Sequence, residues 1–102
     1  MKEYDIFLPL RYNDGEPIEL IKFWQLQQRL LGHFSGLTYF PQPNQGLWKL
    51  GDVTYRDEIV IFRVLASDSR RARRLLRELK EELKAELRQE EILIVERDVK
   101  SL

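Results

Sequence analysis

Alternating apolar and polar residues near the start of the chain predict a β-strand over Tyr4–Leu10. Pro9 removes a backbone donor and limits hydrogen bonding near the end of this strand. A cluster of turn-forming residues follows at positions 13–17, and apolar residues then recur at helical spacing. This second pattern predicts a helix over Ile18–His33.

The middle of the chain contains three β-prone runs. The first two, Leu37–Phe40 and Leu47–Leu50, are separated by Pro41–Gly46, where two prolines cannot donate to a ladder. We interpret this segment as a loop or bulge that interrupts one strand. After a turn at Gly51–Asp52, the longest β-prone stretch predicts a third strand over Thr54–Leu65.

The last third of the chain predicts a helix and a final strand. A stripe of leucines among charged residues indicates a helix over Ser69–Gln89, and Glu91–Arg97 is typical of a strand. The order strand, helix, strand, strand, helix, strand is that of a split βαβ unit. We therefore expect a single α+β domain, residues 1–102, with a ferredoxin-like βαββαβ fold. Its four-stranded antiparallel sheet should carry both helices on one face, with the first and third strands central.

The predicted third and fourth strands are apolar on both faces, although a sheet with one bare face should alternate. Central strands can carry some exposed apolar residues, which is the simpler explanation. We favour a homodimer in which two open sheet faces pack together, because burial of apolar surface contributes roughly 25 cal/mol per Å². The candidate interface residues are Val60, Phe62, Val64, Leu93 and Val95.

Composition narrows the chemistry. The chain has no cysteine, which excludes disulfides, thiolate zinc sites, iron–sulfur clusters and cysteine nucleophiles. No apolar run approaches the roughly 20 residues of a membrane helix, and the N-terminal residues do not resemble a signal peptide. We therefore expect a cytoplasmic protein without a membrane partner, and no residue pattern calls for a metal or a cofactor.

Charge is balanced overall, with 17 basic and 17 acidic residues, so the whole molecule has no field that favours nucleic acid. It is segregated within the predicted second helix, where arginines crowd the region Arg70–Arg77 and glutamates follow. This arrangement opposes the helix dipole. Three explanations of this charge pattern remain open. The charges could belong to a face that is simply solvated, the arginines could bind phosphates, or two copies of the helix could meet antiparallel.

Few residues can support catalysis. His33 is the one histidine, and its place at a predicted helix end suits charge complementarity better than catalysis. Alternation sends Arg56 and Glu58 to one face of the third strand and Asp57 to the other. A buried Glu58 would favour its neutral form and could act as a general base, whereas a neighbouring arginine favours the charged form. An Arg–Glu pair at the sheet end is the structural alternative.

Aromatic residues flank the proline-rich segment. Tyr39 and Trp48 could line a cleft beside Arg56 and Glu58 and bind a small apolar ligand with one polar handle. Such aromatic residues are more often part of a core. These four residues are the candidate ligand-binding residues of the chain.

Three short motifs resemble the pattern of a family of short bacterial proteins whose function is not established. They are Gly36-Leu37-Thr38, Gly46-Leu47-Trp48 and Tyr55-Arg56-Asp57-Glu58-Ile59. The resemblance covers about a quarter of the chain, implies a ferredoxin-like fold and carries no activity. The predicted fold is also similar to that of dimeric α+β barrels, which include small-molecule sensors, oxygenases and isomerases; this is an analogy of fold.

Three functions are compatible with these patterns. The first is a homodimeric, non-catalytic domain that binds a small ligand or regulates a partner, and it is the interpretation that we favour from sequence. The second is a small enzyme with Glu58 as general base and Arg56 as anion binder. The third is nucleic-acid binding through the Arg70–Arg77 cluster, which the balanced net charge disfavours.

Overall fold

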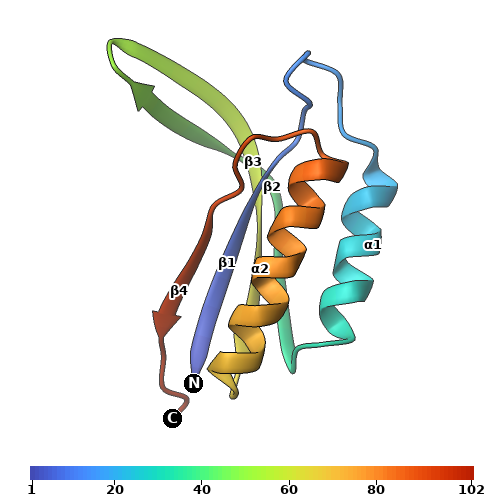
Figure 1. The fold of residues 1–102 in the computed structure, drawn as a ribbon, viewed down its shortest axis with the longest axis vertical. Coiled ribbons are helices and arrows are strands. Elements are labelled where there is room, and N and C mark those ends of the chain that lie inside the picture. Colours follow the sequence, from blue (N-terminus) through green and yellow to red (C-terminus); the bar gives the residue numbers. More distant parts are fainter.

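A computed structural model describes all residues 1–102 and shows an α+β fold with a four-stranded antiparallel sheet and two helices (Figure 1). The strand order is β2-β3-β1-β4, so the first and third strands are central, as predicted. Both helices lie over the same face of the sheet (Figure 1). The elements are β1 (Lys2–Pro9), α1 (Leu20–Leu31), β2 (Gly36–Leu50), β3 (Val53–Ala66), α2 (Ser69–Glu86) and β4 (Ile94–Asp98).

One hydrophobic core lies between the sheet and the helices. On β3, Val60, Phe62 and Val64 are fully buried, and they share this core with leucines from α1 and α2. They therefore face the helices, and their assignment to an interface between copies is wrong. The hydrophobic pattern shows that both faces of β3 are apolar, but it does not show which of them the helices cover.

The opposite face of the sheet is open. Ile59 and Ile61 of β3 lie on it and are half-buried, and Val95 of β4 lies on the same face, across Asp5 of β1 from Arg63. Leu93, which precedes β4, is 41% exposed. Of the predicted interface residues, Leu93 and Val95 therefore remain accessible.

An ionic cluster occupies one end of this open face. Asp5 is only 4% exposed and accepts hydrogen bonds from Arg63 (2.8 and 3.0 Å) and Arg97 (2.6 Å). Burial acts to raise the pKa of Asp5, but the two guanidinium groups outweigh it and hold the pKa below its usual value. Glu3 also pairs with Arg97 at 2.9 Å. The open face is thus ionic at one end and apolar at the other.

Strands β2 and β3 form a long hairpin that projects beyond the body of the molecule (Figure 1). The proline-rich segment is part of β2, and a bulge between Phe40 and Asn44 absorbs the prolines. Of the two expectations for this segment, the bulge is confirmed and the loop is wrong. Gly51 turns the chain at the tip with a φ of 62°, a conformation that favours glycine. None of the residues 41–58 is buried.

The remaining differences concern element ends. Helix α1 begins at Leu20 instead of Ile18, and α2 ends at Glu86 instead of Gln89. The first residues predicted for the last strand form a connection, in which Ile92 is buried in the core. Neither helix is both long and apolar enough to cross a membrane.

Candidate functional site

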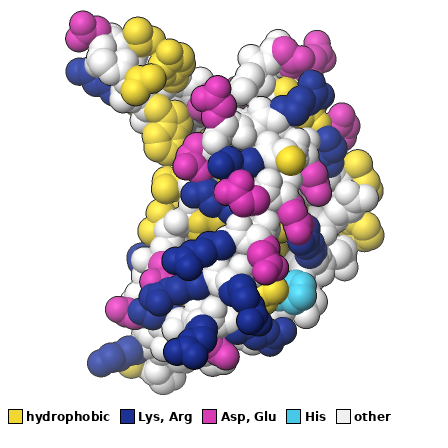
Figure 2. Space-filling model, viewed as in Figure 1, with side chains coloured by type: hydrophobic (Ala, Val, Ile, Leu, Met, Phe, Trp, Pro, Cys, Tyr) yellow, Lys and Arg dark blue, Asp and Glu magenta, His cyan; other side chains and the backbone are white.

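A cleft of about 500 Å³ lies at the base of the projecting hairpin. Its walls come from three segments that are far apart in sequence: the start of β3, the connection between β1 and α1, and the connection after α2. Figure 2 shows the molecule hollowed between the hairpin and the top of the body. The lining residues are Pro9, Arg11, Tyr12, Asn13, Gly15, Tyr55, Arg56, Asp57, Glu58 and Gln89.

Arg56 and Glu58 both line this cleft, as predicted for a shared site. Their ladder partners on β2 are Leu47 and Gln45, so the two side chains lie two positions apart on the same strand. Glu58 is exposed, so the condition under which burial would favour its neutral form is not met. Salt bridges form elsewhere in the chain, for example Lys2–Asp98 and Arg97–Asp5, but neither Arg56 nor Glu58 takes part in one. Both charges are therefore available to a ligand.

Arg56 and Glu58 lie near each other because both belong to one regular strand, and their role in binding a ligand stays a prediction. Their approach to the opposite wall depends on β1, where the backbone N–H of Leu10 donates to the carbonyl of Glu58 at 3.0 Å. This bond fixes the start of the β1–α1 connection against β3. It brings Arg11 and Tyr12 to the same cleft, and no local sequence pattern predicts this proximity.

Tyr12 anchors that opposite wall. It is 5% exposed, and its hydroxyl donates to Glu19 while it accepts from the ammonium of Lys22 at 2.6 Å. The bond from Tyr12 is the main reason why the pKa of Glu19 is lowered, and the bond to Tyr12 is the main reason why the pKa of Lys22 is raised. The connection before α1 is therefore held by a charge-assisted network.

Arg88 also contacts this aromatic ring. Its guanidinium lies 4.2 Å from the centre of the Tyr12 ring, within the range of a cation–π contact. Arg88 is also the one residue other than glycine with a positive φ, 53°. Asn13 donates to its carbonyl at 3.2 Å. The end of α2 and the β1–α1 connection are thereby joined, which keeps this wall of the cleft in place.

The two aromatic candidates lie elsewhere. Tyr39 stacks on Phe62 in the core with ring centres 4.5 Å apart, and burial raises its pKa. Trp48 pairs with Tyr55 in the hairpin ladder and is 43% exposed, but it does not line the cleft. The predicted pocket of four residues is therefore wrong in these two members. Tyr55 supplies an aromatic side chain to the cleft instead.

His33 lies beyond the end of α1 and contributes to a small hollow of about 150 Å³ with Ser67 and Asp68. Figure 2 shows this histidine on the right-hand side of the body, far from the hairpin at the upper left. It cannot act in the cleft. No group of three or more acidic or histidine side chains is close enough to hold a metal ion.

The fold and the cleft define a small α+β protein with a polar, solvent-accessible site. No family model matches the chain, and no curated protein matches it. A solved structure of a phage SAM lyase in complex with S-methyl-5'-thioadenosine is similar, with a TM-score of 0.71. The two chains are 11% identical, and the match covers 95% of this chain and 80% of the lyase.

This likeness corrects the function favoured from the sequence. The similar structure is that of an enzyme, which conflicts with a non-catalytic binding or regulatory domain and favours the enzyme alternative. At 11% identity the likeness itself shows a shared fold. The activity of this chain must therefore be argued from its own cleft.

Proposed function

We propose that the chain is a small-molecule enzyme of the lyase class, with its active site in the cleft at the base of the β2–β3 hairpin. The observation that carries this proposal is the meeting of an unpaired carboxylate, Glu58, with an unpaired guanidinium, Arg56, in a cleft of about 500 Å³. The order of elements and the strand order β2-β3-β1-β4 also support our assignment of the fold to the ferredoxin-like type.

Different lining residues of the cleft suit different groups of a substrate. Arg56 and Arg11 are the cations that can hold a substrate carboxylate, since a guanidinium forms two parallel hydrogen bonds to such a group. Tyr55 offers an aromatic surface for a ring. Glu58 is the candidate general base, because a carboxylate accepts protons and attracts a positively charged centre.

The substrate class that we propose is a sulfonium nucleoside such as S-adenosylmethionine. It combines a carboxylate, a positively charged sulfur and a flat purine, and these match Arg56 with Arg11, Glu58 and Tyr55. The similar solved structure supports this choice, because its ligand is the thioether that remains when the amino-acid arm of S-adenosylmethionine is removed.

The reaction that fits these groups is an elimination. Glu58 takes a proton from the carbon next to the one that carries sulfur, and that C–H electron pair forms a carbon–carbon double bond. The carbon–sulfur bond breaks, and its electron pair goes to sulfur. The sulfonium becomes a neutral thioether, so charge and atoms balance without an added oxidant or cofactor. The loss of positive charge at sulfur also releases the product from Glu58.

The test is release of S-methyl-5'-thioadenosine from S-adenosylmethionine, followed by chromatography. We expect turnover by the wild type, and a decrease of at least about 100-fold in kcat for Glu58→Gln, the usual range for loss of a general base. Arg56→Gln should mainly raise KM, because it removes a contact made to the substrate before the reaction. Asp52→Asn, at the tip of the hairpin, is the matched control and should retain full activity.

Binding separates the chemical role of Glu58 from a structural one. Calorimetry with S-methyl-5'-thioadenosine should give similar affinity for the wild type and Glu58→Gln, since the neutral thioether does not need the carboxylate. Absence of turnover together with absence of thioether binding by the wild type would refute the proposed substrate class.

A further inference from the structure

The first half of α2 carries a second charged surface, remote from the cleft. The exposed side chains of Arg70, Arg74 and Arg77 line a shallow depression of about 590 Å³, together with Ser69, the neighbouring Arg73 and one acidic residue, Glu78. Figure 2 shows Lys and Arg gathered over this part of the molecule, while acidic side chains lie further along toward the cleft. We call Arg70, Arg74 and Arg77 the arginine row.

The arginine row is not neutralised within the chain. Arg73 binds Glu96 of β4 through two hydrogen bonds of 2.7 and 2.8 Å, but none of the three members of the row forms a salt bridge. These arginines also oppose the dipole of their own helix and repel one another, which costs stability. Local conflicts of this kind are expected at functional sites.

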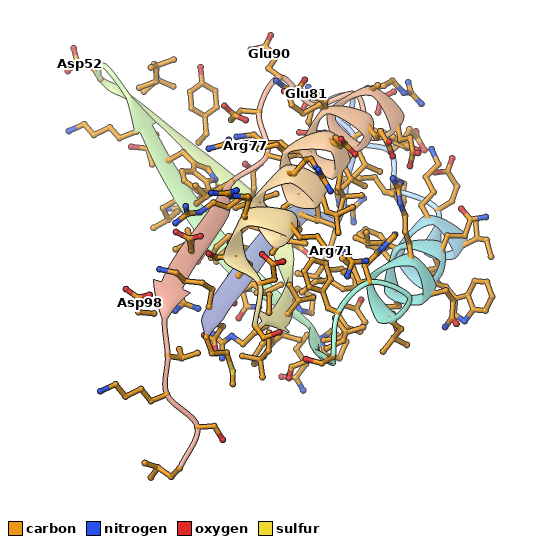
Figure 3. All side chains as sticks on the ribbon, turned by 60° about the horizontal axis from the view of Figure 1, so that its bottom comes forward. Asp52, Arg71, Arg77, Glu81, Glu90 and Asp98 are labelled. Atoms are coloured by element: carbon orange, nitrogen blue, oxygen red, sulfur yellow. The ribbon has the colours of Figure 1, made fainter.

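The side of α2 on which a side chain lies distinguishes the arginine row from the neighbouring Arg71. Figure 3 shows Arg77 on the side of α2 toward β4 and Arg71 on the side toward α1. Arg77 also lines a groove with Ile94, whereas Arg71 lies beside the end of α1. Arg70, Arg74 and Arg77 are spaced by four and three residues, so they follow one face of the helix. They extend over roughly 10 Å of its axis.

We propose that the arginine row binds the phosphate backbone of double-stranded nucleic acid. A duplex of DNA carries about one charge per 1.7 Å, so about six phosphates lie along the roughly 10 Å of the row. No aromatic side chain lines the depression, so there is nothing on which an unpaired base could stack. Contact is therefore limited to the backbone and does not depend on sequence.

A second copy of α2 fits this surface less well. An antiparallel arrangement would place the row against the glutamates of the partner helix, but exposed ion pairs contribute too little to offset the entropy lost on association. Binding to a duplex gains instead from the release of condensed counterions. The balanced charge of the whole chain remains a barrier to tight binding, and this predicts weak, salt-sensitive affinity.

Fluorescence anisotropy with a labelled 20-base-pair DNA duplex tests the proposal. At about 150 mM salt we expect Kd between about 10⁻⁶ and 10⁻⁴ M, and three phosphate contacts should weaken binding about 40-fold between 50 and 200 mM salt. Arg74→Gln/Arg77→Gln should leave one contact and reduce this change to about 3.5-fold. The control Lys49→Gln/Lys100→Gln removes the same charge elsewhere and should retain the wild-type salt dependence.

Three results would overturn the proposal. The first is no binding of the duplex at 20 mM salt. The second is an equal loss of salt dependence in both double variants, which would assign binding to net charge alone. The third is equally tight binding of a polyglutamate peptide, which would show that the surface recognises acidic protein. Circular dichroism verifies that both variants fold.

Discussion

Glu96 shows how one residue joins two elements of this fold. It accepts hydrogen bonds from two guanidinium nitrogens of Arg73 on α2, Nε and Nη2, and from the hydroxyl of Tyr4 on β1 at 2.7 Å. The bond from Arg73 is the largest cause of the fall in the pKa of Glu96 to about 2, and Tyr4 adds to it. Burial is the main cause that raises the pKa of Tyr4 to about 12, with Glu96 as the second.

These shifts predict a pH-dependent contribution to stability. Because the pKa of Glu96 is lower in the folded chain than its ordinary value of 4.5, its contribution is complete above pH 4.5 and is lost as pH falls toward 2. The variant Glu96→Gln should therefore lower the melting temperature by a few degrees at pH 7 and make little difference at pH 2. Thermal denaturation followed by circular dichroism at both pH values measures this difference. An equal effect at both would exclude the ionised Glu96 as the cause.

At the same scale, the sequence predicts some site residues and misses others for a physical reason. Arg56 and Glu58 are recognisable because strand alternation places residues two apart on one side. Tyr12 and Arg88 are not, because their contact joins positions 76 residues apart, and no periodicity in either segment specifies it. A buried tyrosine in contact with two cations requires the tertiary fold.

Among the elements, α2 depends most on burial. Its charges oppose the helix dipole, so its stability must come from the apolar stripe that packs on the sheet and from its N-cap, where Asp68 accepts from the backbone N–H of Arg71 at 3.1 Å. Leu76 lies in that stripe and is 3% exposed.

Truncation of the stripe tests this explanation. Leu76→Ala should reduce the free energy of unfolding by about 2–5 kcal/mol, because it removes buried methyl groups and leaves a cavity. The control Leu20→Ala truncates the same side chain where it is 82% exposed, and it should change stability by at most about 0.5 kcal/mol. Urea denaturation of both variants provides the comparison. Similar losses in the two would contradict a helix held mainly by its buried face.

The hairpin shows where element prediction from sequence is limited. Two prolines within six residues favour a break, yet β2 continues on both sides of its bulge. An edge strand tolerates proline because one side of its backbone has no ladder partner. Whether a strand lies at an edge is a property of the sheet, and local sequence does not reveal it.

Over the whole molecule, the order of elements was predictable because each apolar period is long and clear. The side of the sheet that remains open was not. Homodimerisation through this open face stays a prediction, and the residues that would carry it are now Ile59, Ile61 and Val95 with their neighbours instead of the buried Val60, Phe62 and Val64. A cytoplasmic location likewise stays a prediction.

Solution mass by light scattering over a tenfold concentration range tests the dimer. We expect a dimer for the wild type and a monomer for Ile61→Asp, because a charge on the open face would be buried without a partner. Ile21→Asp, on the exposed side of α1, should remain dimeric. A monomeric wild type would refute the dimer.

In the projecting hairpin, the residues that shape the cleft are separate from the residues that stabilise the core. Residues 41–58 contribute no buried side chain, yet their last members form a wall of the cleft. Substitutions here can therefore reshape the cleft without the stability penalty that accompanies changes in a core. Over evolutionary time, the segment is free to explore new substrates while β1, residues 59–66 of β3 and the helices preserve the fold.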